Sequence, residues 1–279
     1  MNFLPLNGLQ IRTLLKLVRW YLSYFILSRN KYKSSYRDWA KAEAACKDGY
    51  QDTELFNKIL YANLAVKNKE YPYERDSVLF DKIEYSYQLN AHIMSIYLAK
   101  GKKISILDFG GSFGTVYRQY ASMAGFSTIN NWFVIEQAKF CEFGKGYFED
   151  DVLEFYSSDD ISFSDLSYDV AVFSAVLEFV ERPYEYIDQV ANNASCDYMI
   201  FDRSLFSDVD RDKLCQLVSS PKTTIARYPC WIFSESKFKD FMAKDWRLVD
   251  EWDTLDGTIF SGLQMGIYKG QIWKRKEKT

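Results

Sequence analysis

The sequence contains little of what metal centres and secreted scaffolds require. It has one histidine, His92, and five cysteines, none of them in CxxC spacing. Zinc sites need several Cys or His ligands at short spacings, so we expect no metal ion. The number of cysteines is odd, and the N-terminus has no apolar run followed by a small-residue cleavage site. Both features predict a protein of the reducing cytoplasm.

Acidic residues are absent from the first 37 positions, which contain seven Lys and Arg residues. A net charge of −3 for the whole chain and +7 for this segment leaves −10 for the remainder. Nucleic-acid binding requires clustered Lys and Arg side chains that contact phosphates. The acidic body therefore predicts that no nucleic acid is a partner.

Residues 9–27 have the pattern of a basic amphipathic helix. Arg12, Lys16 and Arg19 follow at steps of four and three, which puts them on one helix face opposite a broad apolar face. A membrane-spanning helix needs about 20 mostly apolar residues, and these cations interrupt the run. Two interpretations stay open: residues 9–33 lie peripherally on the inner membrane, or the apolar face docks on the body or on a partner subunit. The sequence does not indicate an oligomeric state.

Hydrophobic periodicity divides the chain into four parts. Residues 1–33 form the basic arm, and residues 34–101 have apolar residues at helical spacing, which predicts a helical cap. Residues 102–272 form the main domain, and residues 273–279 form a charged tail.

From residue 102 onward, short apolar runs alternate with helical patterns. Two further apolar runs, 247–253 and 263–270, flank Asp256-Gly257 and predict an antiparallel pair at a sheet edge. Near-continuous apolar strands that alternate with helices are typical of a parallel sheet covered on both faces. The predicted fold is an α/β, Rossmann-like sheet, mostly parallel with an antiparallel last strand, and preceded by the helical cap. The five parallel strands are predicted at residues 104–109, 132–137, 153–158, 169–176 and 197–203.

A glycine-rich turn follows the first predicted strand. Asp108 ends the strand, and Gly110, Gly111 and Gly114 come next. Glycine lets the backbone approach a ligand closely, and the following helix offers free N–H groups at its N-terminus. A dinucleotide-binding turn requires G-x-G-x-x-G, and counted from Gly110 its second and third glycines are replaced by Ser112 and Thr115. This spacing argues against a nicotinamide-dependent oxidoreductase, which is kept as an alternative.

An acidic strand end with glycines two and six positions later resembles the first motif of class I methyltransferases, which bind S-adenosylmethionine. Ser112 occupies the middle position, where that motif often has glycine. Glu136 ends the second strand, where a carboxylate can accept hydrogen bonds from both ribose hydroxyls of a nucleoside. The expected cofactor site also includes Gln137, next to Glu136, and Asp159, which could face the adenine amino group. It is completed by Ser174 at the end of the fourth strand.

Beyond the superfamily, the chain resembles an uncharacterised bacterial family of methyltransferase-like proteins often found with surface-polysaccharide genes. Ser204 and Leu205 stand where that family has Thr and Pro, which affects the loop shape and not the fold. The resemblance implies a methyltransferase fold and S-adenosylmethionine as the cofactor. It covers roughly residues 34–260 and is carried by segments 35–40, 73–77, 107–112, 132–137, 176–184, 201–206 and 228–233.

Methyl transfer from a sulfonium depends largely on the orientation of the two reactants. A base is needed only when the acceptor must lose a proton, as a sugar hydroxyl does. The strand order places Glu178, Asp202 and Tyr228 for that task, whereas His92 is expected to be an ordinary helix residue. Arg203 could clamp an anionic group of the acceptor, or form an ion pair with Asp202 or Asp208 that anchors its loop.

The sequence therefore predicts S-adenosylmethionine-dependent O-methylation of a small molecule or a glycan precursor. The expected partner is a small-molecule or saccharide acceptor. An alternative of a different class is a catalytically silent module that binds S-adenosylmethionine.

Overall fold

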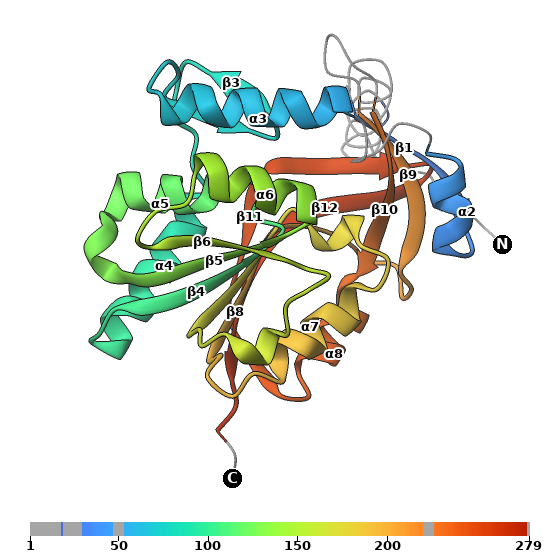
Figure 1. The fold of residues 1–279 in the computed structure, drawn as a ribbon. Coiled ribbons are helices and arrows are strands. Elements are labelled where there is room, and N and C mark those ends of the chain that lie inside the picture. The colour runs from blue at the N-terminus through green and yellow to red at the C-terminus, as the bar shows by residue number, and fades with distance from the viewer. Residues whose placement is uncertain (1–17, 19–29, 47–52, 220–225, 278–279) are drawn as a thin grey trace, which may run out of the picture.

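The computed structural model describes residues 18, 30–46, 53–219 and 226–277. Its centre is a twisted sheet with helices on both faces (Figure 1). The parallel part has the order β6-β5-β4-β7-β8, so the chain starts in the middle, runs to one edge and then returns to the other side of β4. The predicted α/β, Rossmann-like fold is confirmed. These strands are β4 (Ile104–Phe109), β5 (Ile129–Glu136), β6 (Leu153–Ser157), β7 (Val170–Ser174) and β8 (Tyr198–Ser207).

The last two strands complete the sheet as an antiparallel pair. β12 (Gln264–Arg275) pairs antiparallel with β8, and β11 (Trp246–Ser261) pairs with β12. The predicted antiparallel last strand is confirmed, but the predicted turn at Asp256-Gly257 is wrong. These two residues lie inside β11, at a register shift, and the chain turns at Gly262, whose φ is +66°. Both sites carry a glycine, so the sequence offered two turn signals.

Helices cover the two faces of the sheet with separate hydrophobic cores. Residues of α4, α5 and α6 pack on one face, and residues of α7 and α8 pack on the other. The helices are α4 (Tyr87–Lys100), α5 (Thr115–Ala124), α6 (Ala138–Tyr147), α7 (Pro183–Ala191) and α8 (Glu235–Met242). Short 3₁₀ turns are η1 (Phe126–Thr128), η2 (Phe163–Asp165) and η3 (Leu177–Phe179).

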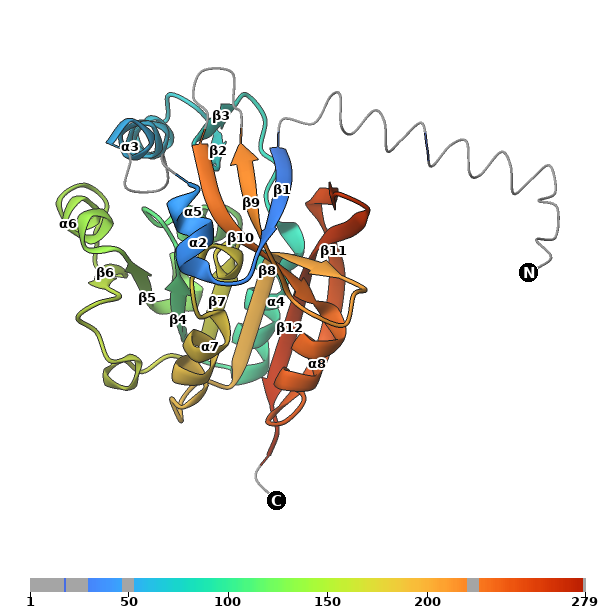
Figure 2. The same ribbon diagram turned by 90° about the vertical axis from the view of Figure 1, so that its right-hand side faces the viewer.

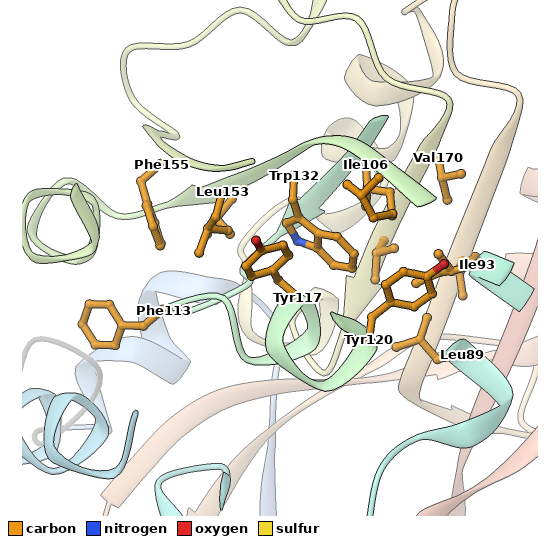
Figure 3. Close-up of a cluster of buried hydrophobic side chains, with 14 of the residues drawn as sticks. Leu89, Ile93, Ile106, Phe113, Tyr117, Tyr120, Trp132, Leu153, Phe155 and Val170 are labelled. Atoms are coloured by element: carbon orange, nitrogen blue, oxygen red, sulfur yellow. The ribbon is translucent and has the colours of Figure 1, made fainter. Parts of the chain in front are cut away.

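The sequence of β4 is almost entirely apolar because both faces of the strand are buried. Ile104 and Ile106 enter the core under α4 and α5, whereas Leu107 and Phe109 enter the core under α7, because alternate side chains of a strand point to opposite faces. Figure 3 shows the first core, with Trp132 from β5 at its centre between side chains of α5 and of the sheet. A strand buried on both faces has no solvent side for polar residues.

A three-stranded antiparallel extension was not expected from the sequence. β1 (Asn30–Tyr36) pairs with β9 (Lys213–Ser219), and β9 pairs with β10 (Ala226–Ser234). β10 joins the main sheet through Phe233 and Ser234, which pair with the carboxyl end of β8. In Figures 1 and 2, β1, β9 and the hairpin β2–β3 lie at the same end of the molecule as α3.

The range 34–101 is only partly the helical cap that the sequence predicts. It contains α2 (Trp39–Ala44), α3 (Thr53–Lys67) and α4, but also the end of β1 and a hairpin, β2 (Tyr73–Arg75) and β3 (Val78–Phe80). The helical prediction is wrong at the hairpin, where Asp76 and Ser77 have φ of +51° and +64°. These are the angles of a two-residue hairpin turn. A short mixed run of this kind does not distinguish strand from helix by periodicity.

The predicted amphipathic arm lies, apart from Val18 and residues 30–33, outside the described residues. Residues 30–33 belong to β1 and pair with β9. Within the described ranges, no helix is both long and apolar enough to cross a membrane. The choice between membrane contact and docking of the arm stays a prediction.

Candidate functional site

A cavity of about 780 Å³ opens at the carboxyl ends of the parallel strands. Its lining includes the ends of β4, β5 and β7, the middle of β8, the hairpin β2–β3 and residues of β1, β9, β10, β11 and β12. The strand order reverses between β4 and β7, and ligands of open α/β sheets bind outside the carboxyl ends of the strands at such a point. The volume is typical of a pocket for small molecules.

The glycine turn forms the floor of one half of the cavity. Gly110 and Gly111 line it, and a Cβ on either residue would collide, with Val176 in the first case and with the Asp108 carboxyl in the second. Gly110 has a φ of +71° and donates from its N–H to the Ile135 carbonyl at 2.8 Å. The turn is thus fixed against β5, and its backbone faces the cavity with no side chain in between.

Gly114 does not line the cavity, although the sequence placed it in the cofactor site. It caps the start of α5 with a φ of +81°, and a Cβ there would lie 2.9 Å from a methyl group of Leu153. Its glycine is therefore explained by helix initiation and by packing on β6. Ser112 does line the cavity, and its φ of +53° shows that a side chain is accommodated in the turn.

The two strand-end carboxylates, Asp108 and Glu136, lie at this half of the cavity. Trp132 donates from Nε1 to Asp108 Oδ2 at 3.0 Å, and Asp108 Oδ1 is buried with no hydrogen-bond partner among the described residues. Burial, followed by the nearby charge of Glu136, raises the pKa of Asp108 to about 7 against the Trp132 hydrogen bond. An unsatisfied oxygen of this kind is a place for a polar ligand group.

Glu136, which the sequence predicts to bind a ribose, already accepts two hydrogen bonds from the protein backbone. Its Oε1 accepts from the Ser112 N–H at 3.2 Å, and its Oε2 accepts from the Gln137 N–H at 2.9 Å. Burial raises the pKa of Glu136, although these two hydrogen bonds oppose it. A carboxylate has about four acceptor positions, so lone pairs remain for a ligand.

The other residues predicted for the cofactor site lie partly in the cavity and partly on the protein surface. Gln137 and Ser174 line the cavity. Asp159 is exposed and does not line it, whereas its neighbour Ser158 does. The placement of Asp159 at the cofactor is therefore not supported by the geometry, because the side chain lies on the surface of the loop after β6.

The other half of the cavity is aromatic and contains a buried carboxyl group. Glu178, in η3 directly after β7, is completely buried and lines the cavity beside Phe179. Tyr228 of β10 lines the same half and contacts the Phe179 ring edge-on at 5.9 Å. Tyr32 and Tyr268 also line it, with their hydroxyls 2.7 Å apart. The sequence pointed to Glu178 and Tyr228 but not to the other tyrosines.

Asp202 lies between the two halves, in the middle of β8, where it pairs with Ser174 at the carboxyl end of β7. It is fully buried and accepts from Trp252 Nε1 at 3.2 Å and from the Ser174 hydroxyl at 3.4 Å. Burial raises its pKa, and the charge of the adjacent Arg203 and the hydrogen bonds from Ser86 and Trp252 only partly offset that effect. Asp202 is thus a polar group with an elevated pKa beside the cofactor half.

Arg203 forms ion pairs with two carboxylates, one from β11 and one from the hairpin turn. Its guanidinium donates to Asp256 in β11, with Nε to Oδ2 at 2.6 Å, and to both carboxyl oxygens of Asp76 in the hairpin turn, at 3.2 and 2.5 Å. Burial alone would lower the pKa of Arg203, but the two carboxylates raise it well above its ordinary value. The ion-pair interpretation of Arg203 is supported, but the partners are Asp76 and Asp256 and not the predicted Asp202 or Asp208.

The hairpin β2–β3 brings further polar residues to the cavity. Glu74 of β2 is buried, lines the cavity and accepts from the Thr115 hydroxyl at the start of α5. Thr115 also donates to Asn63 of α3 at 3.2 Å. Arg75 lines the cavity too, and its buried Nη1 has no hydrogen-bond partner among the described residues. The segment 73–77 of the family resemblance was the only signal for them.

Backbone strain is concentrated around the cavity. Non-glycine residues with a left-handed backbone cost roughly 1–3 kcal/mol each and cluster at ligand sites. Five such residues, with φ between +51° and +64°, line this cavity: Asp76, Ser77, Ser112, Ala175 and Arg203. Within the described ranges, no group of three or more His, Cys, Asp or Glu residues could hold a metal ion.

Sequence comparison identifies no family for this chain. No family profile matches it, and no curated protein matches it significantly. The resemblance to the bacterial polysaccharide-associated family therefore stays a prediction.

Several solved structures have a similar arrangement of elements. They include the N-terminal domain of EvdMO1 in the presence of SAH and D-fucose (10% identity, 83% of this chain, 99% of that one, TM-score 0.45). A second is an S-adenosylmethionine-dependent methyltransferase from Clostridium acetobutylicum (10% identity, 78% and 98%, TM-score 0.42). A third is magnesium protoporphyrin IX methyltransferase from Synechocystis with bound SAM (12% identity, 68% and 79%, TM-score 0.41). Because these similarities are distant, we base the functional proposal on the residues of the cavity.

Proposed function

We propose that the protein is an S-adenosylmethionine-dependent methyltransferase that methylates an oxygen of a small-molecule or saccharide acceptor. One observation carries the proposal: a single cavity at the switch point joins a glycine turn and two strand-end carboxylates to an aromatic pocket with a buried carboxyl group. The first half suits a nucleoside cofactor, and the second suits an acceptor. A volume of about 780 Å³ is large enough for both.

The residues present fit the cofactor. Glu136 has lone pairs for the ribose hydroxyls, and Gly110 and Gly111 bring their backbone to the cavity at positions where a Cβ would collide with Val176 or with the Asp108 carboxyl. Asp108 Oδ1 offers a buried acceptor for an N–H or O–H of the ligand. Arg75 Nη1 is an unsatisfied donor for the carboxylate of the methionine part. The cofactor supplies a methyl group already activated on a sulfonium, so these residues need only bind and orient it.

Asp202 is the residue best placed to remove a proton from an acceptor hydroxyl. It lies in the middle of β8, beside Ser174 at the carboxyl end of β7, and it lines the cavity next to the cofactor half. Its raised pKa makes it a stronger base near neutral pH than an ordinary aspartate. Tyr228 forms part of the acceptor wall, and Arg203 holds the hairpin and β11 around the site through its two ion pairs.

Calorimetric titration with S-adenosylhomocysteine tests the proposal. We expect the native protein to bind, and Asp108→Ala and Glu136→Gln each to lower the affinity by about tenfold or more, because each removes a buried polar contact. Glu136→Gln keeps one oxygen that can accept from the loop. Glu149→Ala, an exposed acidic residue after α6, is the control and should bind normally. Absence of binding by the folded native protein, or unchanged affinity in both site variants, would overturn the proposal.

A further inference from the structure

The acceptor half of the cavity has the chemistry of a cation site. Tyr32, Tyr228, Tyr268 and Phe179 line it together with Glu178. Aromatic faces attract ammonium groups, and this attraction is strongest where water is excluded. A buried carboxylate attracts the same kind of group. Aromatic rings and a carboxylate around one space therefore favour a positively charged ligand group.

Glu178 lacks the partner that a buried carboxyl group needs. It is completely buried, and no other described residue donates a hydrogen bond to either of its oxygens. Burial raises its pKa to about 8, and its own backbone N–H and the charge of Arg203 offset this only in part. Buried ionisable groups are normally paired or hydrogen-bonded. Glu178 borders the cavity, so a ligand can provide the missing donor.

The charge of the lining disfavours an anionic acceptor. Of the described side chains that line the cavity, eight are acidic and three are basic. Arg203 is engaged by Asp76 and Asp256, and Arg75 lies 3.8 Å from Glu84. A phosphate or carboxylate on the acceptor would meet repulsion from the surplus of carboxylates. An ammonium group would be attracted by it.

We propose that the acceptor carries a positively charged amino group, bound by Glu178 and the surrounding tyrosine rings. The acceptor is then a hydroxylated amine, such as an amino sugar or an aromatic amino alcohol. Phosphorylated compounds are excluded as acceptors. This inference rests on the proposed function for the methylated hydroxyl. It makes Glu178 an acceptor-binding residue and leaves the removal of the hydroxyl proton to Asp202.

Three probes that share a phenol ring and differ in charge test the inference. Tyramine is cationic, tyrosol is neutral, and 4-hydroxyphenylacetate is anionic. Their binding is measured by calorimetry with and without saturating S-adenosylhomocysteine. The proteins are the native chain, Glu178→Gln, which keeps the shape but removes the charge, and the control Glu185→Gln, at an exposed glutamate of α7.

We expect the native chain and the control to bind tyramine more tightly than tyrosol, and 4-hydroxyphenylacetate most weakly. Glu178→Gln should lose about tenfold or more of the tyramine affinity, while its affinity for tyrosol changes little. Equal affinities for the three probes, no detectable tyramine binding, or a tyramine preference that survives in Glu178→Gln would overturn the inference. The titration with S-adenosylhomocysteine alone reports separately on the proposed cofactor site, so the two proposals can fail independently.

A second readout detects the ionisation of Glu178. With no cation beside it, a carboxyl group whose pKa is about 8 is mostly protonated at pH 7, and binding of an ammonium favours the carboxylate. Tyramine binding at pH 7 should therefore release a proton, which calorimetry in buffers of different ionisation enthalpy measures. The release should be absent in Glu178→Gln. Tyramine binding to the native chain without proton release would contradict the role of Glu178.

Discussion

Gly110→Ala adds one methyl group at the point where the glycine turn packs against Val176, in the segment after β7. The residue has a φ of +71°, and an added Cβ would lie 2.8 Å from Val176 Cβ and nearer still to a Val176 methyl group. The left-handed backbone costs an L-residue about 1–2 kcal/mol, and the overlap adds roughly 1–3 kcal/mol. Together these lower the free energy of unfolding by about 2–5 kcal/mol and the Tm by several degrees.

The matched control is Gly101→Ala at the end of α4. Gly101 has a similar φ of +63°, but an added Cβ would meet no atom within 4 Å. This variant therefore carries the backbone cost without the overlap. The difference between the two alanine variants isolates the steric part. The double variant Gly110→Ala/Val176→Ala should recover part of it in a double-mutant cycle, because it removes the nearest Val176 methyl group and keeps the Val176 Cβ at 2.8 Å.

Urea unfolding and S-adenosylhomocysteine titration check both consequences. We expect Gly110→Ala to be less stable than Gly101→Ala by at least about 1 kcal/mol and to lose cofactor affinity, because the new methyl group lies in the cavity floor. Gly101→Ala should keep the affinity of the native chain. Equal stabilities of the two variants, or a double variant with no recovery, would refute the close packing of the turn against Val176.

Three further predictions concern buried charges. In Asp108 the raised pKa, about 7, means that the native state binds a proton more tightly than the unfolded state between about pH 4 and 7. Without ligand, the free energy of unfolding should therefore fall by up to about 4 kcal/mol as the pH rises through this window. Urea unfolding of Asp108→Asn should show no such fall. Arg203→Gln leaves two carboxylates without their partner and should lower the free energy of unfolding by about 2–3 kcal/mol. The control Arg182→Gln, at an exposed ion pair, should change it by no more than about 0.5 kcal/mol. Thermal unfolding compares the two variants. Thr115→Val removes a donor to buried Glu74 and should cost about 1–3 kcal/mol in the same assay, and an unchanged Tm would contradict that contact.

The parallel sheet could be predicted because its signals are local. β4 and β7 are short apolar runs next to helical patterns, and their side chains fill two cores on opposite faces. The glycine turn was recognised for the same reason, since a strand, its terminal Asp108 and the following glycines are contiguous. Gly114 was assigned to the ligand because sequence spacing alone cannot distinguish a glycine that faces a cavity from one that packs on Leu153.

The antiparallel extension could not be predicted, because its pairing partners are far apart in the chain. Tyr32 of β1 pairs with Leu217 of β9, and its hydroxyl meets Tyr268 of β12. No periodicity in the segment around Tyr32 indicates these neighbours. The same is true of Arg203, whose partners Asp76 and Asp256 come from the hairpin and from β11. The sequence suggested nearer carboxylates because it gives only chain distance.

The two halves of the cavity therefore have different structural origins. The cofactor half is built from adjacent elements, β4, the glycine turn and β5, whose geometry follows from the parallel sheet itself. The acceptor half depends on β8, which at ten residues is longer than the five-residue β7 and continues past it to pair with β10. The part of β8 that extends beyond β7 thus positions β10, and with it Tyr228, beside Glu178. Because the extension contributes no residue to the glycine turn, substitutions at Tyr32 or Tyr228 should change the choice among tyramine, tyrosol and 4-hydroxyphenylacetate while leaving the affinity for S-adenosylhomocysteine unchanged.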